Sequence, residues 1–442
     1  MKLKSVKIRN FRAIGALDLD LDPHLTVLIG ENAAGKTCVL DALAMGLRPL
    51  VDRIRRRGGG GAAGGPLDRT PPEIRRVLGV PAPFACVQLQ SNDSHWWEHR
   101  LLRDLTAETS AEARSILPPI SPHGLWAVLD PIIASRGGGS AAEPLPFAAY
   151  YGTERAVLTS PATSRLVDEE TEWSTAYRGA MRPAAHFNSL IQWFSVVEAD
   201  ELRHQRDEDP AWSHPQLAAV RRAVESVIPR AKHLRVSARR RLEVSLTEPD
   251  GHEELLSLNE LSGGYRTLLA LVADLARRMA QANPTLGTDS EAIVLIDEVD
   301  LHLHPKWQQT VLDSLRRAFP NAQFIVTTHS EQVIAAVEPK HIVRLDRVAD
   351  GVAASRPTST YGATPDRVAE DVMGVPHLRP AHVEDTLSRY WTLINAGNGE
   401  VPAAVELRET LDGWFQGEEP EMIRADAEIK RQKMLRKLRG SP

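Results

Sequence analysis

The chain has 442 residues, about three times the ~150 residues typical of one domain, so we expect two or three structural units. Its hydrophobic fraction of 42% and charged fraction of 25% exclude a disordered or fibrous chain. A net charge of −5 excludes a globally basic protein, so any contact with nucleic acid must use a local patch.

The first fifty residues alternate between strand and helix patterns. Residues 3–11 begin as a strand, and leucines alternate with aspartates at period two over 17–22. Residues 25–29 are wholly apolar, the pattern of a strand buried on both faces. A loop bounded by glycines follows, and we expect a helix over residues 37–47.

Residues 51–254 are expected to form a large insertion, rich in strands first and helical afterwards. Glycine-rich stretches at 57–66 and 136–144 indicate linkers or surface loops. In the second half, apolar residues recur at helical spacing. They are Phe187, Leu190, Ile191, Phe194 and Val197, and then Leu217, Val220, Val224 and Val227.

The pattern of a buried strand returns at residues 292–296 and 324–326. The first run ends in Asp297 and Glu298, and the second in T-T-H-S. Polar residues at the carboxyl ends of buried strands indicate an α/β sheet with its ligand along that edge. We therefore predict an α/β fold.

This fold would be assembled from both ends of the chain. Residues 1–50 and 255–350 would form its two parts, with the insertion 51–254 between them. Residues 351–442 would form a polar, helical C-terminal extension.

Residues 30–37 match the phosphate-binding pattern G-x-x-x-x-G-K-[ST] between a strand and a helix. The glycines allow successive N–H groups to converge on a phosphate. Lys36 would reach the β- and γ-phosphates, and Thr37 would give its hydroxyl to Mg²⁺. We expect ATP and Mg²⁺ here, held by Gly30, Glu31, Asn32, Ala33, Ala34, Gly35, Lys36 and Thr37.

The pair Asp297 and Glu298 has the position of a Walker B motif. Asp297 would hold Mg²⁺ through water, and Glu298 would act as the general base that polarises the attacking water. Such a pair is weak evidence alone, and the phosphate loop is what makes it informative.

A second anion site is predicted at residues 261–265, L-S-G-G-Y, which precede a helical stretch at 266–279. Ser262, Gly263 and Gly264 would lie at a helix N-terminus with free N–H donors. One nucleotide needs one phosphate site. A second site makes sense if two copies pair and each closes the other's site.

These motifs resemble those of ABC-type ATPases of the SMC/RecF/RecN superfamily. The matching segments are I-R-N-F-R at 8–12, G-E-N-A-A-G-K-T at 30–37, L-S-G-G-Y-R at 261–266, I-V-L-I-D-E-V-D-L-H-L-H-P at 293–305 and T-T-H-S at 327–330. The resemblance implies an ABC-type P-loop ATPase head with a helical lobe bearing Ser262.

More narrowly, residues 301–308 and 323–330 resemble compact bacterial ATPases without a hinge, such as the ATPase subunits of the Septu and retron anti-phage systems. Residues 150–155 and 361–374 share this resemblance. It implies that Val299 and Asp300 begin the D-loop.

The resemblance also assigns His329 as the switch histidine at the γ-phosphate, and Arg12 and Cys38 as nucleotide-binding residues. In two places the sequence departs from the family pattern. Ala33 and Ala34 replace a glycine common in the loop, and Tyr265 replaces the usual Gln or Glu.

Other features leave alternatives open. The Q-loop glutamine has three candidate places, Gln88, Gln90 and the region around Gly152. His302 and His304 have no nearby cysteines that would complete a metal site. The order of residues at His95 and His99 does not match H-E-x-x-H, which favours aromatic packing there. Basic stretches at 53–57, 230–241 and 430–439 are either solvated faces or tracks for a nucleic-acid backbone.

The resemblance implies an ATPase of bacterial anti-phage defence. We expect it to regulate a separate effector protein, a nuclease or toxin, because no effector chemistry is visible in the chain. ATP would be sandwiched in a homodimer or higher oligomer. The alternatives are a DNA-repair or chromosome-maintenance ATPase that binds DNA or RNA, and, less favoured, a transporter subunit.

The cellular compartment is expected from the cysteines and from the hydropathy. Two cysteines, Cys38 and Cys86, are too few for a disulfide framework. No stretch resembles a signal peptide or reaches the ~18 apolar residues of a membrane span. We therefore expect a cytoplasmic protein without a membrane partner.

Overall fold

The computed structural model describes most of the chain as two compact units, Met1–Pro365 and Asp366–Pro442. The glycine-rich stretches predicted at 57–66 and 136–144 lie mostly outside the described residues. No described helix is long and apolar enough to cross a membrane. The described residues are 1–57, 73–104, 106–136, 143–156, 173–183, 187–228, 230–239, 241–247, 250–349, 351–375, 379–415 and 419–438.

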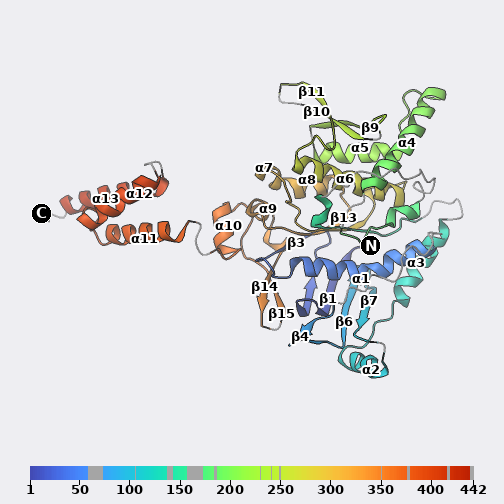
Figure 1. Ribbon diagram of the computed structural model, residues 1–442, viewed down its shortest axis with the longest axis horizontal. Helices are drawn as coiled ribbons and strands as arrows, with labels where there is room; N and C mark the ends of the chain where they lie inside the picture. Colours follow the sequence, from blue (N-terminus) through green and yellow to red (C-terminus); the bar gives the residue numbers. More distant parts are fainter. Residues whose placement is uncertain are drawn as a thin grey trace. The chain divides into compact units, whose positions relative to one another are not determined.

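A six-stranded sheet forms the centre of the first unit (Figure 1). All neighbouring strands pair in parallel except β15, which is antiparallel to β14. The runs predicted to be buried strands are confirmed, because every residue of β3, β12 and β13 is buried. The order across the sheet is β15 (Gly351–Ser355), β14 (Ile342–Val348), β3 (Leu25–Ile29), β13 (Ala322–Thr327), β12 (Ala292–Ile296) and β8 (Phe147–Tyr151).

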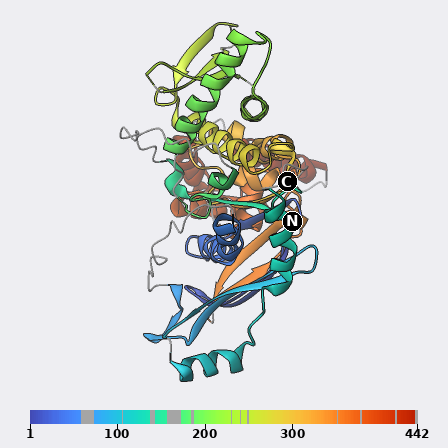
Figure 2. The ribbon, with the colours of Figure 1, turned by 90° about the vertical axis from the view of Figure 1, so that its right-hand side faces the viewer.

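Helix α1 (Lys36–Arg57) lies between this sheet and a second, antiparallel one (Figures 1 and 2). The predicted helix end at residue 47 is wrong. The helix continues through Pro49 because Leu50 and Ile54 are fully buried. The second sheet has the order β2 (Ile14–Asp20), β1 (Leu3–Phe11), β6 (Phe84–Ser91) and β7 (Trp96–Leu102).

Helices cover the opposite face of the central sheet (Figure 2). The helices predicted from apolar spacing are confirmed as α4 (Phe187–Asp207) and α5 (Pro215–Val227). Helix α6 (Gly263–Ala282) is longer than predicted by three residues at each end. The remaining helices of this unit are α2 (Ala107–Ile116), α3 (His123–Ser135), α7 (Pro305–Gln308), α8 (Val311–Ala318) and α9 (Glu331–Ala335).

Residues 51–254 do not form one separate insertion. Strand β8 pairs in parallel with β12 and thereby extends the central sheet, and β6 pairs with β1 in the second sheet. A short antiparallel sheet that the sequence did not predict follows the helices. It contains β9 (Ala231–Val236), β10 (Leu242–Thr247) and β11 (Glu253–Ser257).

The C-terminal extension also begins later than predicted. Residues 351–355 form β15 instead of a helical tail, because Val352 is buried against the phosphate loop. The first unit then continues to Pro365.

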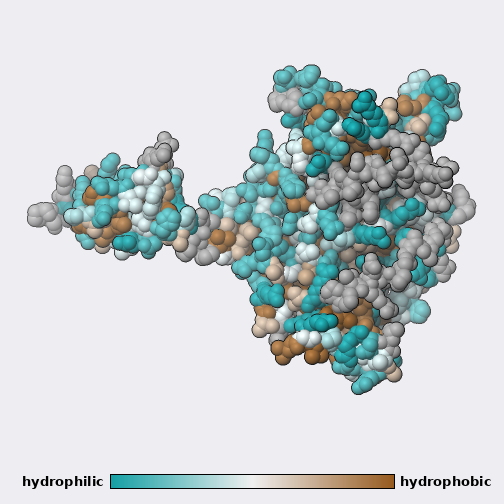
Figure 3. Space-filling view, in the orientation of Figure 1, coloured by the Kyte–Doolittle hydropathy of each residue, from teal (hydrophilic) through white to brown (hydrophobic). Residues whose placement is uncertain are grey.

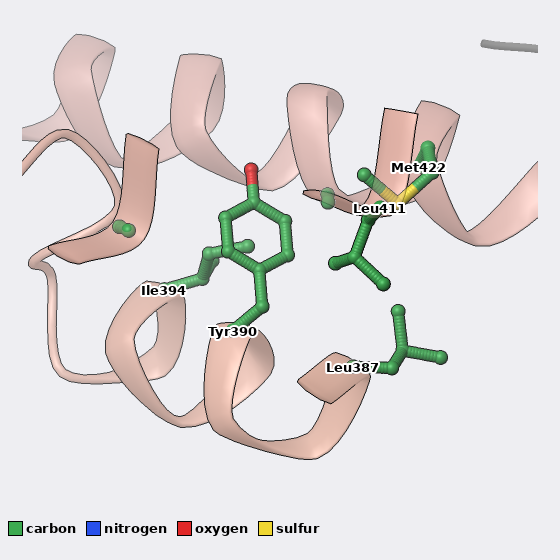
Figure 4. Packing of buried hydrophobic residues seen from close by; sticks show 7 residues of the cluster. Leu387, Tyr390, Ile394, Leu411 and Met422 are labelled. Carbon is green, nitrogen blue, oxygen red and sulfur yellow. The ribbon is translucent and has the colours of Figure 1, made fainter. Parts of the chain in front are cut away.

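The second unit, which begins at Asp366, contains a small helical core. Leu387, Tyr390 and Ile394 of one helix pack against Leu411 and Met422 of the two others (Figure 4). The helices are α10 (Pro365–Asp371), α11 (Ala381–Asn395), α12 (Pro402–Phe415) and α13 (Pro420–Leu438).

A small hairpin of β4 (Arg76–Val77) and β5 (Val80–Pro81) exposes apolar side chains near the second sheet (Figure 3). Val77, Leu78 and Val80 are all exposed, and Leu78 is almost fully so. Nothing in the described part of the chain packs over them.

Gln323 on β13 holds the N-terminal strand against the central sheet. Its side chain is fully buried, and its Oε1 accepts from the N–H of Leu3 at 2.7 Å. Its Nε2 donates to the carbonyls of Leu3 at 2.7 Å and Asp22 at 2.8 Å. One amide therefore satisfies three backbone groups in the interior.

Replacing Gln323 by Leu should lower the free energy of unfolding by about 2–4 kcal/mol, because three buried backbone groups lose their partners. Urea denaturation followed by tryptophan fluorescence measures this loss. Gln309→Leu, at an exposed position, is the control and should change little. Equal losses in both variants would contradict the role of Gln323.

Candidate active site

The phosphate loop between β3 and α1 adopts backbone conformations that favour glycine. Gly30 has φ +145° and Gly35 has φ +102°. A Cβ atom at Gly30 would lie 2.3 Å from the carbonyl oxygen of Leu345, and one at Gly35 would lie 2.9 Å from Cγ2 of Val352. The hairpin β14–β15 therefore also requires both glycines.

Ala33 takes a left-handed conformation with φ +64°. This conformation costs an L residue about 1–2 kcal/mol, which a glycine would avoid. The loop therefore keeps the shape of a glycine-containing loop even though the sequence departs from that pattern.

Lys36 folds back over the loop. Its Nζ donates to the carbonyl of Gly30 at 2.8 Å and to that of Glu31 at 2.9 Å, and the residue is buried. Burial lowers the pKa of Lys36, while the charges of Asp297 and Glu298 oppose that shift. The ammonium group is thus held at the mouth of the loop, where a phosphate oxygen could replace the carbonyls.

Thr37 and Asp297, which were both predicted to hold Mg²⁺, lie in direct contact. The hydroxyl of Thr37 donates to Oδ2 of Asp297 at 3.0 Å, and the hydroxyl of Thr327 donates to Oδ1 at 2.6 Å. Hard oxygen ligands of this kind suit Mg²⁺, which usually takes one or two protein oxygens and completes its shell with substrate phosphates and water. The pair therefore fits Mg²⁺, which when bound would neutralise charge on the phosphates.

No group of three or more metal-binding side chains occurs among the described residues. His304 instead begins α7, where its ring accepts from the N–H of Lys306 at 3.3 Å. The expectation that the histidine pairs form no metal site stays a prediction.

Glu298 follows Asp297 in a left-handed conformation with φ +48°. Its N–H donates to the hydroxyl of Thr327 at 2.7 Å. The hydroxyl of Thr328, the residue after β13, donates to Oδ1 of Asp300, which follows β12, at 2.5 Å. Thr327 at the end of β13 and Thr328 directly after it thus hold the segment that follows β12.

His329 directly follows Thr328, close to Lys36 and to the carboxylates of Asp297, Glu298 and Asp300. Burial, followed by the charge of Lys36, lowers the pKa of its imidazole. The ring is therefore neutral near pH 7 and has one N–H to donate to a phosphate oxygen.

Arg12 and Cys38 both lie at the first turns of α1, the helix that follows the phosphate loop. Arg12 pairs with Asp41 of α1, which also accepts from the hydroxyl of Tyr150 at 3.0 Å. Cys38 lies half-buried in the first turn of α1. Their assignment to the nucleotide stays a prediction.

Ser262 begins α6, but its hydroxyl makes no capping hydrogen bond to the helix. Gly264 packs on the D-loop, because a Cβ atom there would lie 2.5 Å from the carbonyl oxygen of His302. No hydrogen bond among the described residues joins Ser262, Gly263 or Gly264 to the phosphate loop. The predicted second anion site therefore has no direct hydrogen bond to the phosphate loop of its own chain, and its role stays a prediction.

Of the three Q-loop candidates, only the region around Gly152 lies at the edge that carries the phosphate loop. Gly152 follows β8, where the carbonyl of Tyr151 accepts from the N–H of Asp297 at 2.8 Å. Gln88 and Gln90 lie on β6 and bond Glu98 and Ser5.

Sequence reasoning missed Arg155, which donates to the backbone of Asp297 and Glu298. The run F-A-A-Y-Y followed by G-T-E-R was an available signal, since it repeats the pattern of a buried strand with polar residues at its carboxyl end. Such a strand would have been expected in the central sheet.

The comparison with protein families now adds to this geometry. The model of the family "AAA domain, putative AbiEii toxin, Type IV TA system" matches residues 25–335, which is more than half of the chain. The chain belongs to this family. A second model, "AAA ATPase domain", matches residues 1–48. This AAA-domain protein is an ATPase, as its sequence predicted.

Similar proteins agree with that assignment. The retron Ec83 probable ATPase of Escherichia coli is 26% identical over 494 residues, which span 98% of this chain and 87% of the relative. The Septu protein PtuA of Bacillus mycoides is 48% identical over 73 residues, 16% of this chain and 10% of that protein. The predicted resemblance to these ATPases is confirmed.

Solved structures give one further comparison. The SMC head domain from Thermotoga maritima has 15% sequence identity and a TM-score of 0.39, covering 81% of this chain and 100% of that one.

Replacing Lys36 by Ala removes the ammonium group from the mouth of the loop, so ATP binding should weaken at least about tenfold and turnover should be lost. Fluorescent-nucleotide titration and phosphate release measure the two effects. Lys4→Ala, at an exposed site on β1, is the control and should behave as the wild type. Wild-type affinity and turnover in Lys36→Ala would contradict the phosphate-loop assignment.

Proposed function

We propose that this ATPase acts as a switch in bacterial anti-phage defence, in which ATP closes two copies of the chain onto each other and the closed form controls a separate effector protein. ATP would lie between Lys36 of one copy and Ser262 of the other. Hydrolysis, with Glu298 as general base and His329 at the γ-phosphate, would reopen the pair. Its place would be the cytoplasm, where Cys38 and Cys86 stay reduced.

The observation that carries this proposal is the free end of α6. Ser262 is exposed and its hydroxyl caps nothing, while the first N–H groups of a 20-residue helix need a partner. An anion would satisfy them and the helix dipole would favour it. A phosphate from a second copy supplies that anion.

The retron and Septu names of the relatives support the defence role. A DNA-repair ATPase is the alternative. It is supported by 46% identity over 43 residues to the RecF protein of Lactococcus lactis, described as a DNA replication and repair protein.

The basic stretches give the alternative little support, because many of their charges have partners within the chain. Arg53 pairs with Asp130, Arg235 with Glu243, and Arg431 with Glu428. These arginines would have to exchange carboxylates for phosphates in order to contact nucleic acid.

Glu298→Gln tests the closure. The variant should bind ATP, hydrolyse it only at a low residual rate, and accumulate as closed pairs, because the amide keeps the size of the side chain but cannot act as a base. Sedimentation velocity with and without ATP, combined with chemical crosslinking, measures the pairing. If Glu298→Gln stays a monomer with ATP bound, the proposal is wrong.

The second anion site is best tested at Gly263. Gly264→Asp would clash with the carbonyl of His302 in its own chain, whereas a Cβ atom at Gly263 has only contacts of 3.9 Å or more. Gly263→Asp in the Glu298→Gln background should abolish pairing, because two negative charges meet in a confined gap. Gly263→Asn, which has the same size without the charge, is the matched control and should weaken pairing less. Equal pairing in the Gly263→Asp and Gly263→Asn variants would contradict the proposal that ATP lies between the two copies.

The effector is tested by affinity purification of the Glu298→Gln chain from its native cell, with ATP. Recovery of a nuclease or toxin that the Lys36→Ala chain does not retain is the expected result. Recovery of DNA alone would favour the repair role.

A further inference from the structure

Arg155 lies in the turn after β8, in a short 3-10 segment (Thr153–Ala156), and is 2% exposed. Its guanidinium donates to three backbone carbonyls. Nη1 donates to Gly152 at 2.9 Å and to Asp297, and Nη2 donates to Glu298 at 2.5 Å. One side chain thus joins the end of β8 to the two residues that follow β12.

Consecutive carbonyls of a strand point in opposite directions, so one guanidinium cannot normally reach both. Here it reaches them because the chain turns at Glu298, whose φ is +48°. This left-handed conformation is rare for a residue other than glycine and persists only when its surroundings hold it. Arg155 supplies two of the hydrogen bonds that hold it.

The charged guanidinium of Arg155 contacts backbone carbonyls and not a carboxylate. No ion pair formed among the described residues includes it, although burial lowers its pKa to about 10, against the opposing charges of Asp297 and Asp300. The group therefore remains a cation at neutral pH. Hydrogen bonds from a cation to carbonyls are stronger than those from a neutral donor.

The position of Arg155 is itself fixed. The N–H of Gly152 donates to the carbonyl of Pro183 at 2.9 Å, and a Cβ atom at Gly152 would lie 2.5 Å from Cβ of Pro183. The turn that presents the guanidinium is therefore tightly packed. Asp297, whose carbonyl accepts from Arg155, is held in turn by hydrogen bonds from Thr37 and Thr327 to its carboxylate.

We propose that Arg155 is a positioning residue for ATP hydrolysis, which fixes the backbone of Glu298 so that its carboxylate is held in one direction, ready to act on water. Arg155 acts through Glu298 and does not touch the nucleotide. This inference rests on the proposed role of Glu298 as general base, and it makes the turn after β8 part of the catalytic apparatus.

Arg155→Lys and Arg155→Met test the inference. A lysine has one nitrogen and cannot reproduce the planar fork, so it should restore activity only in part. We expect kcat to fall about tenfold to a hundredfold in Arg155→Met and less in Arg155→Lys, which is no more than the lower end of the 10²–10⁴-fold that a general base contributes, because the carboxylate itself is still present. The dissociation constant for ATP should change less than about twofold, because the phosphate loop is intact.

Arg221→Lys is the matched control. Arg221 also donates to a backbone carbonyl, that of Leu234, and to Glu198 and Glu201, but it lies in the helical lobe. Its replacement should lower the unfolding temperature and leave kcat unchanged. If Arg155→Met does not fold, Arg155→Lys carries the test, with the unfolding temperature of both lysine variants as the measure of structural damage.

A double-mutant cycle separates positioning from simple loss of structure. In the Glu298→Gln background, adding Arg155→Lys should leave the residual turnover unchanged, because the base through which Arg155 acts is already absent. A further, additive loss in the double variant would overturn the inference, as would equal losses of kcat and ATP affinity in the single variant.

The two proposals can fail separately. Wild-type turnover in Glu298→Gln would show that Glu298 is not the general base, and the proposed hydrolytic step would then be wrong. An inactive Glu298→Gln together with normal turnover in Arg155→Met would overturn only the role of Arg155.

Discussion

The carboxylate of Asp297 is the point on which the site depends. It accepts hydrogen bonds from Thr37 at the start of α1 and from Thr327 at the end of β13, and its own carbonyl accepts from Arg155 after β8. The carboxyl ends of four neighbouring strands thus meet at one residue. A buried carboxylate requires such partners, because an unpaired charge in the interior is costly. The site is therefore organised by the chain itself.

Helix α6, which carries the predicted second anion site at its start, is held against the central sheet by buried polar contacts. The hydroxyl of Tyr151 on β8 donates to Asp274 of α6 at 3.0 Å, and Asp274 pairs with Arg277 and Arg278 in the interior. Helix α6, which begins at Ser262, is thus fixed to the strand beside Asp297. Breaking buried ion pairs to bring Ser262 onto the chain's own nucleotide would be costly. This favours closure between two copies.

Much of this could be predicted from the sequence, because glycine loops and buried strands with polar ends are local patterns. The phosphate loop, Asp297 and the strands β3, β12 and β13 were of this kind. The same pattern, a five-residue apolar run followed by polar residues, was present at β8, but its place in the central sheet was not predicted. The role of Arg155 was missed for a different reason. Its acceptors are backbone carbonyls, which every residue has, so no sequence pattern marks them. Likewise, Val352 covers Gly35 only through the pairing of β14 with β15.

The central claim is that each ATP site is completed by a second copy of the chain, and mixing two inactive variants tests it most directly. Lys36→Ala lacks the ammonium group of the phosphate loop. In Gly263→Asp, the added carboxylate should repel a phosphate from the start of α6. In a mixed pair, the intact loop of one copy faces the intact Ser262 end of the other. The account predicts that the mixture hydrolyses ATP although neither preparation does so alone. Absence of turnover in the mixture, with both variants folded, would contradict it.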